Sequence, residues 1–327
     1  MLPISIKEIL EAKERIAGVV HHTSLIHSES LSEMSGVNLF FKAENLQKTG
    51  SFKIRGAANK IFSLPDGVRS VITASSGNHG QAVAFASRIR GISATVVMPE
   101  GGSPAKAASI ISYGAELIYC GTTSDERISL AKKMSEERGA IYVAPFDDPF
   151  VMAGQGTIGL EIFEDLEDVA AVLVPTGGCG LISGVATALK ESDPDIAVMG
   201  VEPEGSNSTG LSFRAGRRTA LDKIDTIADG IRTTIPGELT FPVVERYVDD
   251  MLTVTDGDVL KAQYLILERC KILAEPTGAV ATAAVLCGAL PEKYRGRNVV
   301  ALISGGNVAM SSLADCLKNT DIQCQAQ

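Results

Sequence analysis

Lys53 is a residue whose type and position suggest covalent chemistry. It follows Ser51 in the segment KTGSFKIRG, and Ser51 predicts the N-cap of a helix that begins beside the lysine. The positive end of a helix disfavours an ammonium group, and the apolar neighbours Phe52 and Ile54 add to the cost of the charge. These surroundings favour a lowered pKa and an amine that can act as a nucleophile. The alternative is an ordinary solvated lysine at a helix start.

A second group of candidates follows the apolar run VRSVITA and precedes a helical segment. It consists of Ser75, Ser76, Gly77, Asn78 and His79. A turn of this kind directs backbone N–H groups and hydroxyls toward one point, which suits a carboxylate. The alternative is a capped turn without a ligand.

A third loop, in the segment PTGGCGLISG, is rich in glycine. Its central residues are Gly177, Gly178, Cys179, Gly180 and Leu181. Glycines let the backbone approach a phosphate, and the helix that follows supplies positive potential. With Ser183 and Glu202 the segment also approximates a dinucleotide-binding fingerprint, which would indicate an NAD-dependent oxidoreductase. Near-contiguous small residues favour a single phosphate, so the oxidoreductase is the more remote alternative.

A fourth loop begins at Ser304, at the end of the run NVVALIS. A hydroxyl at the end of a strand can face a ring nitrogen or a substrate. The alternative is one more glycine turn.

Apolar runs separated by helical segments position these loops. The runs are 38–43, 68–74, 92–98, 115–120, 140–144, 169–175, 196–203 and 298–304. Short Val, Ile and Ala runs between helices are typical of parallel strands covered on both faces. We predict an α/β fold of two doubly wound domains with mostly parallel central sheets. The small domain, 69–147, is inserted into a large domain formed by 1–68 and 148–327.

The composition excludes several classes of partner. The chain has 327 residues and a formal net charge of −9, which disfavours nucleic acid and anionic membranes. No stretch approaches the roughly 18 consecutive apolar residues of a membrane-spanning helix, and the N-terminus lacks the apolar core of a signal peptide. Six scattered cysteines without a CxxC pair are typical of reduced thiols. We expect a cytoplasmic protein.

One ligand would use all four loops: pyridoxal 5′-phosphate, with an aldehyde for Lys53, a phosphate for 177–181, a ring hydroxyl for Asn78 and a ring nitrogen for Ser304. The sequence resembles the fold-type II (tryptophan synthase β-like) pyridoxal-phosphate family of threonine/serine dehydratases and serine racemases. The resembling segments, in family order, are KTGSFKIRGA, SSGNHGQA, AGQGTIGLEI, VPTGGCGLISG, TIADGI, EPTGAV and LISGGN. They span nearly the whole chain.

The resemblance implies how the cofactor is held. Lys53 would bind it covalently and then act as the base at Cα, with Phe52 against the ring. The backbone of 177–181 would hold the phosphate. Asn78 would bond the ring hydroxyl, Ser304 the ring nitrogen, and Glu275 would lie near the ring.

The resemblance also implies a site for the substrate. Its carboxylate would lie on the loop 75–79, and Ser76 stands where racemases keep the hydroxyl that serves the opposite face of Cα. The predicted activity is elimination of water from L-threonine or L-serine, giving a 2-oxo acid and ammonia. The segment PFDDP (145–149) resembles the dehydratases more than the racemases. The alternatives are a serine racemase, a dehydratase of 3-hydroxyaspartate with Arg127 binding the second carboxylate, and an inactive sensor of the cofactor.

Further expectations concern departures from the family pattern and assembly. Cys179 stands where the family usually has a glycine, and it should be tolerated if only its N–H is used. Glu202 matches the first ligand of a racemase-type divalent cation site, but Ser208 stands where an aspartate is expected, which argues against a metal.

No regulatory domain is expected after residue 327, as in the short catabolic form. We expect a homodimer.

Overall fold

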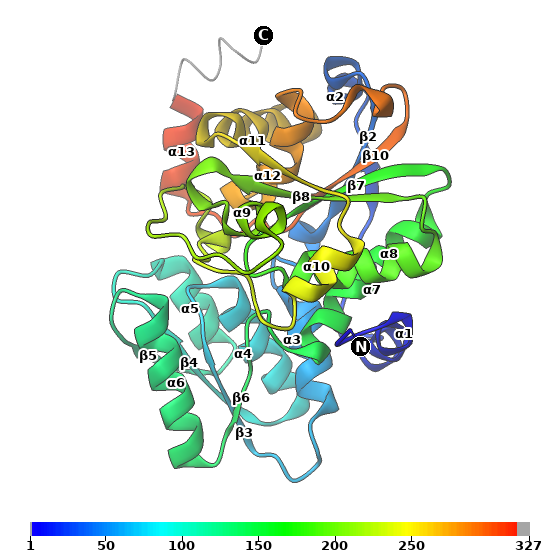
Figure 1. Cartoon of the computed structure of the whole chain (residues 1–327). Coiled ribbons are helices and arrows are strands. Elements are labelled where there is room, and N and C mark those ends of the chain that lie inside the picture. Colours follow the sequence, from blue (N-terminus) through cyan, green and yellow to red (C-terminus); the bar gives the residue numbers. More distant parts are fainter. Residues whose placement is uncertain (1, 319–327) are drawn as a thin grey trace.

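The computed structural model describes residues 2–318 and contains two β-sheets with helices on both faces (Figure 1). The larger sheet has the strand order β1-β2-β10-β7-β8-β9, and the smaller has the order β5-β4-β3-β6. Neighbouring strands are parallel except for β1 with β2. The predicted α/β fold with mostly parallel sheets is confirmed.

Apolar side chains of the larger sheet alternate between two cores. Its strands are β1 (Leu25–His27), β2 (Asn38–Ala43), β7 (Val169–Pro175), β8 (Ala197–Pro203), β9 (Asp250–Val254) and β10 (Asn298–Ile303). In β10, Val299 and Ala301 belong to the core that includes α11 and α12, whereas Val300 and Leu302 belong to the core that includes α8. This alternation explains the continuous apolar runs, since both faces are covered.

The helices of this part of the chain differ in length but share the role of covering the larger sheet or connecting its strands. They are α1 (Ile6–Arg15), α2 (Glu29–Ser35), α7 (Pro149–Asp165), α8 (Gly180–Ser192), α9 (Ser208–Ala215), α10 (Phe241–Tyr247), α11 (Asp256–Cys270), α12 (Pro276–Leu286) and α13 (Met310–Lys318). Short 3₁₀ turns lie at η1 (Glu44–Leu46), η2 (Glu204–Ser206), η3 (Asp229–Ile231) and η4 (Glu292–Tyr294).

The smaller sheet is formed by one continuous stretch of chain. Its strands are β3 (Ser70–Ala74), β4 (Ser93–Met98), β5 (Glu116–Tyr119) and β6 (Ile141–Tyr142). Its helices are α4 (Asn78–Arg90), α5 (Pro104–Ser112) and α6 (Ser124–Arg138), and α3 (Lys53–Ser63) packs against α4. Residues of α3, α4 and α5 share one core with the sheet, and α6 covers the opposite face. All four strands fall within 69–147, and the domain boundaries themselves stay a prediction.

Helix α3 also packs closely on α7, and α7 on α8, so that α3 lies between the two sheets (Figure 1). The approach is close because of glycines from the segment AGQGTIGLEI and its partners. A Cβ added to Gly154 would lie 2.5 Å from the carbonyl oxygen of Arg55 in α3. A Cβ added to Gly184 in α8 would lie 2.3 Å from the carbonyl oxygen of Met152 in α7. Helix α3 is thereby fixed to the helices of the larger sheet.

Two strands lack the apolar runs by which the other eight are recognised. β1 has only three residues and none is buried, and β9 begins with the exposed Asp250. Both are edge strands, where one side of the strand has no neighbour to demand apolar residues.

Within residues 2–318, no helix combines the length and apolar character needed to cross a membrane. Five cysteines are free thiols, namely Cys120, Cys179, Cys270, Cys287 and Cys316. Cys324 lies outside the described residues.

Candidate active site

The loops singled out in the sequence meet where the carboxyl ends of the strands face one another. The N–H of Phe52 donates a 3.0 Å hydrogen bond to the carbonyl oxygen of Ser304. The N–H of Glu275 donates to the carbonyl oxygen of Gly305 at 3.0 Å. Asn78 Nδ2 donates to Glu275 Oε1 at 2.6 Å. The start of α3, the start of α4, the end of β10 and the start of α12 therefore form one cluster.

Lys53 is the first residue of α3, and Phe52, not Ser51, occupies the N-cap position. The predicted N-cap at Ser51 is wrong because Ser51 forms a β-bridge with Gly305 and stays in extended structure. Lys53 Nζ donates to the carbonyl oxygen of Pro145 at 2.9 Å and lies 5.0 Å from the centre of the Phe52 ring. Burial lowers the pKa of Lys53 to about 8. The amine therefore exchanges its proton in the range where a nucleophile or base must work.

Buried ion pairs two residues further along hold the start of α3. Arg55 Nη2 lies 2.8 Å from Glu44 Oε1, and Arg55 Nη1 lies 2.6 Å from Glu161 Oε1. Lys42 Nζ lies 2.7 Å from Glu161 Oε2. These contacts tie α3 to β2, η1 and α7, so Lys53 stands on a rigid base. This cluster could not be predicted from the sequence, because its members are far apart in the chain.

The glycine-rich loop is shaped by hydroxyl groups from elsewhere in the chain. Thr209 Oγ1 donates to the carbonyl oxygen of Gly177 at 3.1 Å, and Thr240 Oγ1 donates to that of Gly178 at 2.9 Å. A Cβ at Gly178 would lie 2.5 Å from the Phe146 ring. The loop therefore has no room for a side chain at Gly178. Without a side chain there, the backbone N–H groups of the loop stay accessible to a ligand.

Cys179 adopts a left-handed backbone conformation, with φ of 70°. Its thiol is buried, with Sγ 3.3 Å from the carbonyl oxygen of Gly177 and 3.2 Å from Thr209 Oγ1. Burial raises the pKa of the thiol well above its usual range. The side chain is thus occupied in the interior, which leaves the N–H as the part of Cys179 that a ligand can use.

The segment 145–148 joins the glycine-rich loop to Lys53. Besides the contacts of Pro145 and Phe146, Asp147 accepts hydrogen bonds from the N–H groups of 238–240 at 2.9–3.2 Å. Asp148 caps α7 by accepting from the N–H groups of Phe150 and Val151. In the sequence, PFDDP was noted only because it resembles the dehydratases. In the structure, each of its first four residues, 145–148, makes a specific contact.

The loop 75–79 has members with different roles. Ser75 Oγ accepts from the N–H groups of Gly77 and Gly80 at 3.1 and 2.9 Å, and it shapes the turn. Ser76 is exposed. His79 is buried, with Nε2 3.3 Å from the carbonyl oxygen of Val143, and burial lowers the pKa of His79 to about 3. His79 is therefore neutral at physiological pH and adds no charge for a carboxylate.

Lys106 lies beside Glu275 and Gly77, although no sequence motif indicated a role for it. Its Nζ lies 2.8 Å from Asp229 Oδ2 and 3.5 Å from Glu275 Oε2. Asp229 lies in the segment TIADGI, which resembles the family pattern, and this resemblance could have marked Asp229 as a residue of the site. Burial raises the pKa of Glu275 to about 7, and the charge of Lys106 opposes that increase.

Glu202, at the end of β8, lies inside the protein beside the start of α9. Its carboxylate is buried and accepts hydrogen bonds from the N–H groups of Thr209 and Gly210 at 3.0 and 2.7 Å. Burial raises the pKa of Glu202 to about 7. Ser208 Oγ donates to the carbonyl oxygen of Thr233. Among residues 2–318, no cluster of three acidic, His or Cys side chains could hold a metal ion.

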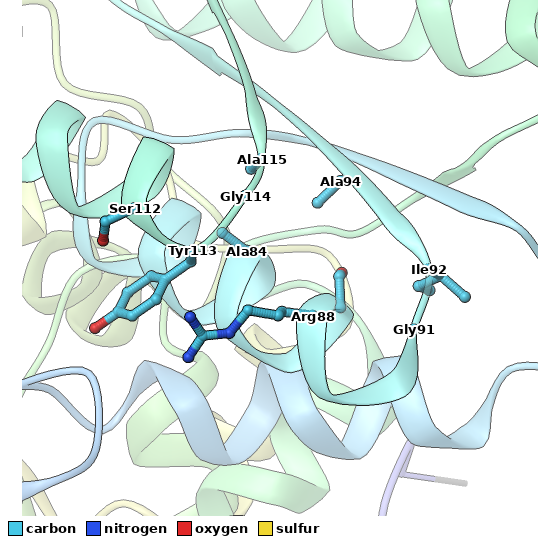
Figure 2. Close-up of a pocket in the computed structure, with 10 residues that line it drawn as sticks. Ala84, Arg88, Gly91, Ile92, Ala94, Ser112, Tyr113, Gly114 and Ala115 are labelled. Atoms are coloured by element: carbon cyan, nitrogen blue, oxygen red, sulfur yellow. The ribbon is translucent and has the colours of Figure 1, made fainter.

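Two other features lie apart from this cluster. Arg127 lies in α6, and its guanidinium donates to the carbonyl oxygen of Thr122, just before that helix, and to Ser124 Oγ in its first turn. Figure 2 shows a pocket of about 290 Å³ in which Arg88 and Tyr113 lie side by side, with 5.2 Å between the guanidinium carbon and the ring centre. This pocket is at the amino-terminal edge of the smaller sheet, opposite the edge where such sheets bind ligands.

The family model described as "Pyridoxal-phosphate dependent enzyme" matches residues 16–305. The chain belongs to this family. The pyridoxal-phosphate cofactor expected from the sequence is thus confirmed. This pyridoxal-phosphate dependent enzyme is 46% identical to the L-threonine ammonia-lyase of Thermotoga maritima over 95% of the chain and 77% of that protein. It is 42% identical to the catabolic L-threonine dehydratase TdcB of Escherichia coli K12, over 96% of both proteins.

Among solved structures, the enzyme is similar to maize serine racemase, with a TM-score of 0.92 and 37% identity over 98% of this chain and 99% of that one. The residues present fit the cofactor: a glycine cradle at a helix N-terminus suits a phosphate, and a buried lysine of lowered pKa suits an aldehyde. Asn78 Nδ2 uses one of its two hydrogens on Glu275, which leaves the second for a ring oxygen.

Proposed function

We propose that the chain is an L-threonine/L-serine ammonia-lyase, which removes water from the 3-hydroxy amino acid and yields 2-oxobutanoate or pyruvate with ammonia. The observation that carries the proposal is Lys53, whose amine is held by Pro145 and has a pKa lowered to about 8 by burial. The high identity to a threonine ammonia-lyase and a threonine dehydratase supports the substrate class.

Each proposed residue has one task. Lys53 Nζ takes the proton from the substrate Cα and returns it to the β-hydroxyl, which leaves as water. The released enamine tautomerises to the imine, which water hydrolyses to the 2-oxo acid and ammonia. The bound cofactor supplies the electron sink for that deprotonation. The backbone of 177–181 holds its phosphate, Ser304 and Asn78 hold its ring, and the turn 75–79 receives the substrate carboxylate.

A second activity, racemisation of serine, has one observation in its favour. Ser76 is exposed on the turn 75–79, and it stands where the racemase pattern keeps a hydroxyl. An exposed hydroxyl is free to move a proton on the face of Cα opposite Lys53. Both activities suit a cytoplasmic homodimer, which we propose on family grounds.

The test is a keto-acid assay with L-threonine, L-serine, D-serine and 3-hydroxyaspartate, together with chiral analysis of the recovered serine. We expect keto acid from the first two substrates and loss of about 10³-fold of the rate in Lys53→Ala. Full activity in Lys53→Ala, or no keto acid from either substrate, would reject the proposal. D-serine formed from L-serine, and lost in Ser76→Ala, would support the racemase.

A further inference from the structure

Lys106 is a buried lysine that the proposed reaction does not use. It lies in the first turn of α5, and its side chain is only 8% exposed. An ammonium group is disfavoured at the positive end of a helix. Two carboxylates compensate for this position, Asp229 at 2.8 Å and Glu275 at 3.5 Å. Both carboxylates lie on the part of the chain that forms the larger sheet, Asp229 in η3 and Glu275 before α12.

The methylene groups of Lys106 support the turn 75–79. A Cβ added to Gly77 would lie 2.3 Å from Lys106 Cδ, so the backbone of Gly77 rests directly on the lysine side chain. The next residue, Asn78, donates to Glu275, which is also a partner of Lys106. Lys106 therefore contacts the turn with its stem and the partners of the turn with its ammonium group.

The charges around this turn depend on Lys106. In the part of the chain that the structure describes, its ion pairs are the only ones that connect 69–147 with the remainder. Burial by itself would lower the pKa of Lys106, but the charges of Glu275 and Asp229 raise it overall. Without this cation, Asp229 would stand beside the turn as an unpaired negative charge, and an approaching carboxylate would be repelled.

We propose that Lys106 is a positioning residue that holds the turn 75–79 against the larger sheet through Asp229 and Glu275 and neutralises the charge of Asp229, so that the turn accepts a substrate carboxylate. This rests on the proposed function, in which the turn receives that group. A lysine that only stabilises the fold would affect unfolding and leave substrate affinity unchanged.

The test uses Lys106→Met, which keeps an unbranched stem and removes the charge. We expect KM for L-serine to rise by about tenfold or more, with a smaller change in kcat. We also expect faster hydrogen exchange at the amides of 75–80, measured without substrate. Lys133→Met, at an exposed position of α6 with 71% of the side chain accessible, is the matched control and should change neither quantity.

Two further variants keep the proposal falsifiable. Lys106→Arg should keep KM close to the wild-type value. Asp229→Asn, added to Lys106→Met, should lower the raised KM again, because it removes the negative charge that the lysine no longer neutralises. A lower melting temperature with unchanged KM and unchanged exchange at 75–80 would overturn the proposal. If the wild-type protein forms no keto acid, the proposed function fails, and the exchange of 75–80 in Lys106→Met still decides whether Lys106 holds the turn.

Discussion

Asn78 Nδ2 donates a 2.6 Å hydrogen bond to Glu275 Oε1, which joins the helix that follows β3 to the residue that precedes α12. Asn307 Nδ2 donates to Asn78 Oδ1 at 3.0 Å, so both ends of the Asn78 amide are fixed. Glu275 is buried, and its pKa is raised to about 7 because burial disfavours the carboxylate. A group that changes protonation near neutral pH therefore lies where the two sheets meet.

Glu275→Gln should make the protein more stable than wild type at pH 8 and leave it nearly unchanged at pH 4. The unfolded glutamate ionises near 4.5, whereas the native one keeps its proton until about 7, so native stability falls as pH rises between these values. Glutamine cannot ionise, and it still accepts from Asn78. We expect a gain of about 1–3 kcal/mol in the free energy of unfolding at pH 8.

Thermal and denaturant unfolding at the two pH values would measure this gain. Glu238→Gln, at a side chain that is 77% exposed, is the control and should show no pH-dependent difference. A Glu275→Gln variant that is less stable than wild type at pH 8 would contradict the expectation.

Lys53→Met should stabilise the cofactor-free protein at pH 7, and the advantage should shrink between about pH 8 and 10.5. The native pKa is lowered from 10.5 to about 8. Below pH 8 the native state therefore holds a buried charge, which lowers the free energy of unfolding, whereas the same charge is solvated in the unfolded chain. Native stability of the wild type therefore rises with pH across this window. We expect a difference on the order of 1–2 kcal/mol after solvent screening. Denaturant titrations of cofactor-free protein from pH 7 to 10.5 would detect it; a constant difference would argue against the lowered pKa.

Gly184→Ala should destabilise the protein, because its Cβ would meet the carbonyl oxygen of Met152 at 2.3 Å and force α7 and α8 apart. Overpacking of this kind costs about 1–3 kcal/mol, and backbone displacement adds to it. Gly67→Ala is a suitable control, since nothing lies within 4 Å of its added Cβ. Equal melting temperatures for the two variants would show that the helices are not in close contact.

Cys179→Gly should be more stable than Cys179→Ala by about 1 kcal/mol, because the left-handed conformation costs every residue except glycine. Both variants lose the buried thiol, so their comparison isolates the backbone. Both should also retain the absorbance of bound cofactor, since the backbone N–H is unchanged. A greater stability of the alanine variant, or loss of cofactor in both, would refute this account of the loop.

The sequence was sufficient for features that are local. Lys53 stands beside a helix start, and the glycine-rich loop lies between an apolar run and a helix, so both could be recognised from a few adjacent residues. The contacts of Lys106, Asp229 and Asp147 could not be predicted in this way, because their partners lie far away in the chain and become neighbours only through the fold. The N-cap predicted at Ser51 failed for the same reason. Ser51 prefers to cap a helix locally, but in the fold it pairs with the distant Gly305 instead.

The glycine contacts of α7 fix some parts of the candidate site to one another and leave the turn 75–79 outside that fixed group. They bind α3, with Lys53 at its start, to the helix that carries the glycine-rich loop, whereas the turn 75–79 belongs to the other sheet. The stretch that forms the smaller sheet therefore carries the turn on a sheet of its own, and it meets α3 through a shared apolar core. Grafting that stretch from a relative of different preference would transfer selectivity for the amino acid, provided that residues matching Lys106 and Asn78 accompany it.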